Sequence, residues 1–209
     1  MKIHDITPPV SVNTAVWPGD VPFTIHSTMS QDRGHSVNVS EIRSTVHLGA
    51  HADAPLHFDS RGFDIARVPL DFYIGPARVI ELLGVKEVTA TDLALVPWAQ
   101  TERLLIKTKS RYQASEFDDQ FPHLTEEAGA LIASKGIRLI GVDVPSVDAC
   151  HSKTLMNHKA FLKARTAILE NLDLSHVPPG VYELIALPLK LVDVDGSPVR
   201  AVLVEREPV

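Results

Sequence analysis

The chain has 209 residues, 44% of them hydrophobic and 22% charged, which is an ordinary composition for one globular domain over residues 1–209. A net charge of −6 argues against a nucleic-acid or anionic-membrane partner, because neither would find a basic face. No segment reads as a secretion signal or as an apolar run of membrane-spanning length, so we expect a cytoplasmic protein. The single cysteine, Cys150, excludes an internal disulfide and favours a small buried hydrophobe.

Strands dominate the predicted elements of the first part of the chain. Residues 1–7 alternate as a short strand, and β-branched side chains indicate two more at 21–30 and 36–46. Before the second strand lies the turn Trp17-Pro-Gly-Asp. Its indole serves either as a plug for the core or as a stacking surface for a planar ligand.

The remaining elements alternate strands with short helices. After Gly75-Pro76, the pattern predicts strands at 77–83, 104–108, 137–142, 181–192 and 199–204, and helices at 91–96, 125–135 and from 157 onward. The helix at 125–135 connects its two flanking strands as one β-α-β crossover. Asp143 ends the second of these strands, where an aspartate serves either a functional site or a turn.

The chemistry is concentrated in residues 47–58, His47-Leu-Gly-Ala-His-Ala-Asp-Ala-Pro-Leu-His-Phe. Three histidines and one aspartate are interleaved there with small or apolar residues: His47, His51, Asp53 and His57. Imidazole nitrogen and carboxylate oxygen bind zinc, manganese and related ions, and a catalytic site keeps one position for water. A lone histidine is usually structural, but this cluster favours a divalent metal site.

This spacing requires a bent backbone. In an extended strand, the His47 and His51 Cα atoms would lie roughly 13 Å apart at about 3.3 Å per residue, too far for one small ion. A helix is disfavoured by Gly49, Pro55 and the β-rich run before them. We therefore predict a bend at Gly49, where glycine can take positive φ, and the later ligands then continue toward the same face.

His158 and Glu170 are the remaining ligand types set in an apolar context. On one unbroken helix the twelve-residue step between them would span about 18 Å, so they could not share an ion. A joint role requires the helix to end near Thr166 and the chain to return as a strand that carries Glu170. The β-branched side chains of Thr166 and Ile168 allow this.

Together these motifs resemble a known family. The chain is similar to the metal-dependent cyclase-like hydrolases, and among them to the bacterial kynurenine formamidases (arylformamidases), in the histidine–aspartate stretch and in Trp17-Pro-Gly-Asp, Asn157-His-Lys, Ile168-Leu-Glu-Asn-Leu and Tyr182-Glu-Leu-Ile-Ala-Leu-Pro-Leu-Lys. The resemblance runs from Ile3 to the C-terminal strand. It implies a homodimer of the α/β class, with a swivelling β/β/α fold and a mixed, strand-rich core.

The resemblance also implies a reaction and roles for single residues. It implies hydrolysis of N-formyl-L-kynurenine to L-kynurenine and formate, in tryptophan degradation by the kynurenine pathway. Two zinc ions would be held by His47, His51, Asp53, His158 and Glu170, with Asp53 bridging them. His57 would be the catalytic proton donor and acceptor, and Trp17 would contact the aromatic substrate. Other divalent metals suit the same ligands.

Two rival functions remain open at this point. The first keeps the fold and changes the substrate to a cyclic imide or an isatin-like ring amide. The second is a metal-binding protein without catalysis, in which His57 is a further ligand or a packing residue.

Overall fold

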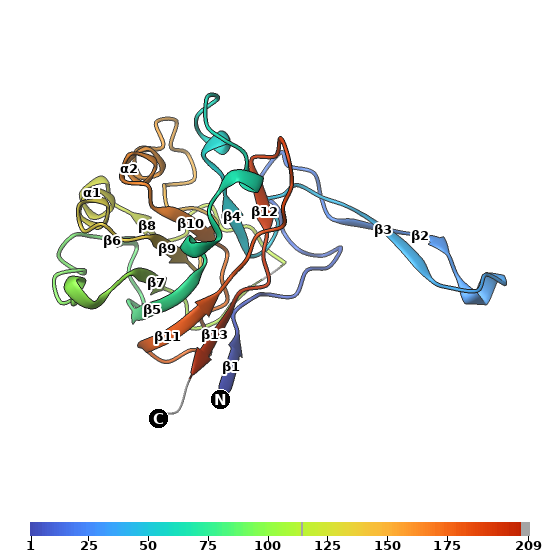
Figure 1. Ribbon diagram of the computed structural model, residues 1–209, viewed down its shortest axis with the longest axis horizontal. Coiled ribbons are helices and arrows are strands. Elements are labelled where there is room, and N and C mark those ends of the chain that lie inside the picture. The colour runs from blue at the N-terminus through green and yellow to red at the C-terminus, as the bar shows by residue number, and fades with distance from the viewer. Residues whose placement is uncertain (114, 206–209) are drawn as a thin grey trace.

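The structure is a computed structural model and describes residues 1–113 and 115–205. It is built on a nine-stranded mixed sheet, in the order β1-β13-β11-β5-β7-β9-β10-β4-β12 (Figure 1). These strands are β1 (Lys2–Asp5), β4 (His51–Asp53), β5 (Ile74–Glu81), β7 (Arg103–Lys107), β9 (Leu139–Val142), β10 (Ala167–Glu170), β11 (Gly180–Ile185), β12 (Gly196–Pro198) and β13 (Val202–Glu205). Strands β5, β7, β9 and β10 are parallel, and antiparallel strands extend the sheet on both sides.

Strand β7 shows why the centre of the sheet is so apolar. All of its residues are buried, and its three middle side chains alternate between two hydrophobic clusters. Leu104 and Ile106 belong to the cluster that contains helix residues such as Phe161, whereas Leu105 belongs to the cluster on the other face. A strand covered on both faces needs consecutive hydrophobic residues, as the middle of this strand has.

Two helices cover one face of the sheet and lie close to each other (Figure 1). Helix α1 (Glu126–Ser134) begins where the sequence predicts, because the Thr125 hydroxyl accepts a hydrogen bond from the Ala128 N–H at 3.2 Å. Helix α2 (Met156–Ala164) connects β9 to its parallel neighbour β10. None of the helices in the described residues combines the length and hydrophobicity that crossing a bilayer requires.

A hairpin of β2 (Thr24–Met29) and β3 (Val39–Arg43) extends away from the rest of the molecule (Figure 1). Every residue of both strands is exposed, including the apolar side chains of Ile25, Val39 and Ile42. A smaller parallel pair, β6 (Glu87–Val88) and β8 (His123–Leu124), lies beside α1. The two strands predicted over 21–30 and 36–46 are confirmed as β2 and β3, all of whose residues are exposed.

Three predicted elements differ from the structure. Strand β5 begins at Ile74 and so includes Gly75-Pro76, because this part pairs with β11 before the pairing with β7 begins. The helix predicted at 91–96 is a series of turns, in which the N–H groups of Ala94 and Val96 bond to the carbonyls three residues back rather than four. Beyond Ile185 the predicted strand at 181–192 retains one isolated bridge, between Pro188 and Val199.

Cys150 is only half-buried, although it packs against the helix-side cluster as a hydrophobe would. Burial raises the pKa of its thiol, so the sulfur is protonated near neutral pH.

Candidate metal centre

The predicted ligands come from two adjacent strands, β4 and β10, from helix α2, and from the turn before β4, which carries His47. Strand β4 carries His51 and Asp53, and the antiparallel register places Glu170, the last residue of β10, opposite His51. Helix α2 carries His158 and ends at Ala164, after which the chain returns as β10. The helix end and the returning strand that a joint role requires are therefore both present.

The bend before β4 lies at Gly49, which has φ +60°. The Gly49 carbonyl lies 2.9 Å from His51 Nδ1 and accepts its hydrogen bond when that nitrogen is protonated. This leaves His51 Nε2 facing the other ligands, 3.5 Å from Asp53 Oδ1 and 3.4 Å from Glu170 Oε2. The predicted glycine bend is confirmed, and it also orients the imidazole that follows it.

A second glycine makes room for His47. A Cβ atom on Gly196 would lie 2.9 Å from His47 Cε1 and 3.0 Å from the Ala52 carbonyl oxygen, too close for a larger residue. In the space left by glycine, His47 Nδ1 lies 3.1 Å from Asp53 Oδ1. Strand β12 therefore shapes the site by lacking a side chain at this position.

Asp53 lies at the centre of the cluster. Both of its carboxylate oxygens are buried, and neither accepts a hydrogen bond of good geometry from a described residue. Yet His47 Nδ1 lies 3.1 Å away, and His158 Nε2 lies 3.4 Å from the second oxygen. A buried carboxylate is costly unless a charge or donors compensate it. Imidazole nitrogens converging on such a carboxylate fit a divalent cation between them.

His158 is held by an aspartate that the sequence analysis missed. Asp148 accepts the backbone N–H groups of Asn157 and His158 at 3.0 and 3.1 Å, and its oxygen lies 2.6 Å from His158 Nδ1. It thereby caps helix α2, because the residue at the cap position, Leu155, offers no side-chain acceptor. His158 Nε2 is left to face Asp53 and Glu170.

A second missed aspartate, Asp195, connects His47 and His57. Its Oδ2 lies 3.0 Å from His47 Nε2 and 3.2 Å from His57 Nδ1. His57 ends a 3-10 turn (Pro55–His57), and its ring centroid lies 4.0 Å from that of His47. In the sequence, the dipeptide Asp195-Gly196 is typical of a turn, and the residues around it do not indicate a site.

Charge compensation within the cluster depends on protons when no metal is bound. Burial lowers the pKa of His158, but Asp148 and Asp53 outweigh this effect and raise it to about 10. Burial also lowers the pKa of His47, but the neighbouring carboxylates of Asp53 and Asp195 outweigh this effect and raise it to about 9. Burial favours a protonated Asp53, yet the surrounding imidazoles hold its pKa well below the usual range. A metal ion must therefore displace protons from these imidazoles.

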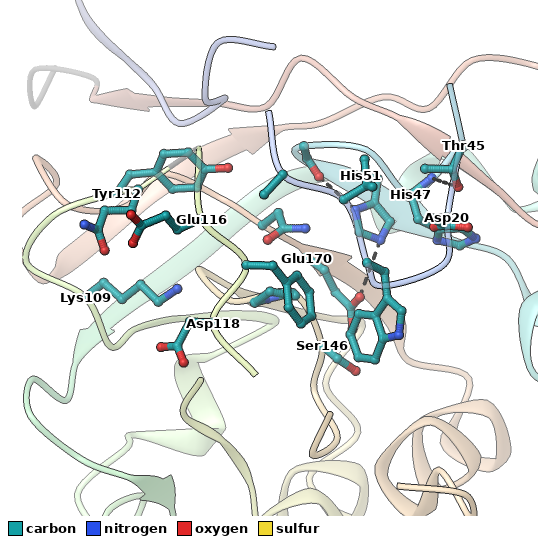
Figure 2. Close-up of a pocket in the computed structure, with 18 of the residues that line it drawn as sticks. Asp20, Thr45, His47, His51, Lys109, Tyr112, Glu116, Asp118, Ser146 and Glu170 are labelled. Carbon is teal, nitrogen blue, oxygen red and sulfur yellow. Dashed lines mark hydrogen bonds and ion pairs between the residues drawn. The ribbon is translucent and has the colours of Figure 1, made fainter. Parts of the chain in front are cut away.

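The centre opens into a cavity of about 820 Å³ (Figure 2). Trp17 is half-buried and lines this cavity. Its ring packs edge-on against Phe117 at 5.2 Å and Phe121 at 6.2 Å between centroids. The two interpretations of Trp17 are thus compatible, because it packs on the hydrophobic cluster and also forms part of the cavity wall.

Comparison with known proteins identifies the family. The Cyclase family model matches residues 4–149. The chain belongs to this family. Kynurenine formamidase from Bacillus mycoides (strain KBAB4) is 45% identical to it over 199 residues, which cover 95% of either chain. Because these matches extend over nearly the whole chain, the family predicted from the motifs is confirmed.

Solved structures agree with this Cyclase family assignment. A structure described as that of a predicted metal-dependent hydrolase from Bacillus stearothermophilus has a TM-score of 0.84 at 30% identity, covering 97% of each chain. Isatin hydrolase A from Labrenzia aggregata has a TM-score of 0.79 at 25% identity, covering 98% of this chain and 94% of its own. The mixed, strand-rich α/β fold expected for the family is confirmed.

Proposed function

We propose that this protein hydrolyses N-formyl-L-kynurenine to L-kynurenine and formate, in tryptophan degradation by the kynurenine pathway. The observation that carries the proposal is the buried Asp53 carboxylate, which is surrounded by imidazoles beside a cavity walled by Trp17. Such a centre suits hydrolysis of an amide, and the aromatic wall suits an anilide. The 45% identical kynurenine formamidase supports the choice of substrate.

We further propose that two zinc ions occupy the centre. His47, His51 and Asp53 would hold one ion, and Asp53, His158 and Glu170 would hold the other. The nitrogen and oxygen donors of these residues match zinc, and their convergence supports a shared site. When bound, the metal pair supplies an ionised water and polarises the formyl oxygen.

His57 would transfer the proton that the reaction needs. With Asp195 accepting the hydrogen bond of His57 Nδ1–H, the free nitrogen is Nε2. Cleavage of the formyl C–N bond requires a proton on the leaving aniline nitrogen, and His57 Nε2 would donate it. His57 is suited to this exchange because 35% of its side chain is exposed to the cavity and solvent, unlike the buried imidazoles.

We also propose that the whole chain forms one catalytic domain that acts in the cytoplasm as a homodimer. The exposed β2–β3 hairpin supports the dimer, since a two-stranded ribbon is rarely stable alone and its apolar side chains are uncovered. A second copy would cover them. Light scattering of the protein, compared with an Ile25→Asp, Ile42→Asp double variant, tests this: we expect a dimer for the former and a monomer for the latter.

The alternative substrate is an isatin-like ring amide, which the structural similarity to isatin hydrolase A favours. To decide, the purified protein is stripped of metal and reloaded with zinc. Formate release from N-formylkynurenine and ring opening of isatin are then measured. We expect zinc-dependent turnover with the linear formamide strongly preferred. Faster turnover of isatin would replace the proposed substrate, and no metal-dependent turnover of either would refute the hydrolase.

A further inference from the structure

The cavity extends well beyond the metal centre, to a charged wall formed by the segment after β7. Figure 2 shows Lys109, Tyr112, Glu116 and Asp118 on one side of the cavity and His47 and His51 on the other. At about 820 Å³ the cavity is far larger than a formamide group requires. The remainder of the substrate would therefore lie along it, toward this wall.

Lys109 is anchored at its base by Asp143. The Asp143 carboxylate accepts the backbone N–H groups of Thr108 and Lys109, both at 2.8 Å, and the Thr108 hydroxyl at 2.6 Å. Asp143 is buried and is not among the residues that line the cavity. Of its two predicted roles, the structure therefore favours the one in which it holds a turn of the backbone. By fixing the end of β7, it determines where the Lys109 side chain begins.

The charged ends on this wall are available for a ligand. Among the described residues, the side chains of Lys109 and Glu116 form neither a hydrogen bond nor a close ion pair, although the Lys109 ammonium group attracts the buried Asp143 carboxylate. In Figure 2 the Lys109 ammonium faces the middle of the cavity, between Glu116 and Asp118. Asp118 is partly engaged, because its Oδ1 accepts the Gln120 N–H at 2.9 Å. A half-buried cation beside an open carboxylate matches a zwitterion.

We propose that Lys109 binds the α-carboxylate of an amino-acid substrate and that Glu116 binds its α-ammonium group. This inference rests on the proposed function, in which the formyl group lies at the metal centre and the aromatic ring lies against Trp17. The amino-acid end of N-formylkynurenine is then the part that reaches the charged wall. Arg111 also lines the cavity, two residues away on the same segment, but it is exposed whereas Lys109 is half-buried, so solvent screens the charge of Arg111 more strongly.

The test compares two substrates in the zinc-loaded protein. One is N-formylkynurenine, and the other is its amine analogue, which lacks the carboxylate but keeps the ammonium group. Lys109→Met is expected to raise KM for N-formylkynurenine roughly tenfold to a hundredfold, the usual effect of losing a charge-assisted hydrogen bond, with kcat little changed. For the amine analogue, the same variant should behave like the unaltered protein.

Two further variants make the assignment specific. Glu116→Gln should raise KM for both substrates, because both carry the ammonium group. Arg111→Met removes the same charge from the same segment and should raise KM for N-formylkynurenine less than roughly threefold. If Arg111→Met matches Lys109→Met, or if Lys109→Met affects both substrates equally, the assignment of Lys109 is wrong. If the unaltered protein does not hydrolyse N-formylkynurenine, the proposed function fails instead.

Discussion

The two halves of the site differ in their exposure to solvent. The side chains of His51, Asp53, His158 and Glu170 are between 1% and 6% exposed, and they converge from β4, β10 and α2. The side chains of His57 and Asp195 are 35% and 43% exposed and face the cavity. The buried half can hold a cation rigidly, and little of its side-chain surface is open to solvent. The open half can exchange a proton and receive a substrate. Changes in the two halves should therefore have separable effects.

The largest expected effect comes from the centre of the buried half. Asp53→Asn keeps the shape of the side chain and removes the charge that three imidazoles surround. We expect almost no bound zinc after dialysis and a loss of formamidase activity of roughly a thousandfold or more. Metal analysis by mass spectrometry and a formate assay measure the two quantities. A variant that keeps its zinc would show that Asp53 is not a ligand.

A loss of rate with the metal retained is expected in the open half. His57→Ala should lower kcat by roughly a hundredfold to ten-thousandfold, the usual contribution of a proton-transferring residue, while the zinc content stays that of the unaltered protein. His151→Ala is the control, since that side chain is 79% exposed and pairs with the exposed Asp119, away from the proposed ligands. Loss of zinc in the His57 variant would support the non-catalytic metal-binding protein instead.

Asp195→Asn tests whether the open half needs its carboxylate. The amide keeps the size of the side chain but no longer favours the His57 tautomer with a proton on Nδ1, 3.2 Å away. We expect kcat to fall roughly tenfold to a hundredfold at saturating zinc, with KM nearly unchanged. An unaltered kcat would mean that Asp195 only supports His47.

Asp148→Asn is the matched change in the buried half. It weakens the capping of α2 and the hydrogen bond that orients His158. Here we expect the affinity for zinc to fall roughly tenfold to a hundredfold, with kcat at saturating zinc close to that of the unaltered protein. Competition with a chelating dye gives the affinity. The comparison between the two halves fails if this variant loses kcat and the Asp195 variant loses zinc.

The smallest effect concerns the stability of the metal-free protein. The pKa values of His47 and His158, about 9 and about 10, lie above the ordinary value of 6.5. Protonation of these two imidazoles therefore adds to the free energy of unfolding. This contribution is fully present below pH 6.5 and is lost as the pH rises through 9 to 10. Thermal midpoints should fall over this range in metal-free protein, and added zinc should remove most of the fall. A flat metal-free profile would contradict the assignment.

Much of the site could be predicted from the residues alone. The bend at Gly49 follows from ligand spacing, and the end of α2 before Thr166 follows from the distance that His158 and Glu170 must close. Both arguments use local geometry, and both features are present. The helix predicted at 91–96 was wrong because the N–H groups of Ala94 and Val96 bond three residues back, as in turns, a choice that residue types alone do not decide.

The sequence by itself determined the candidate metal-ligating residue types, the family and the positions of the main strands along the chain. These depend on residue spacing and hydrophobic pattern. Only the tertiary structure revealed Asp148 and Asp195, which hold the nitrogens of His158 and His57 that face away from the centre. It also revealed that Gly196 leaves space for His47 and that Lys109 shares a cavity with the centre. Asp195 and His57 are 138 residues apart, so their meeting depends on the antiparallel pairing of β12 with β4, and no local pattern records it.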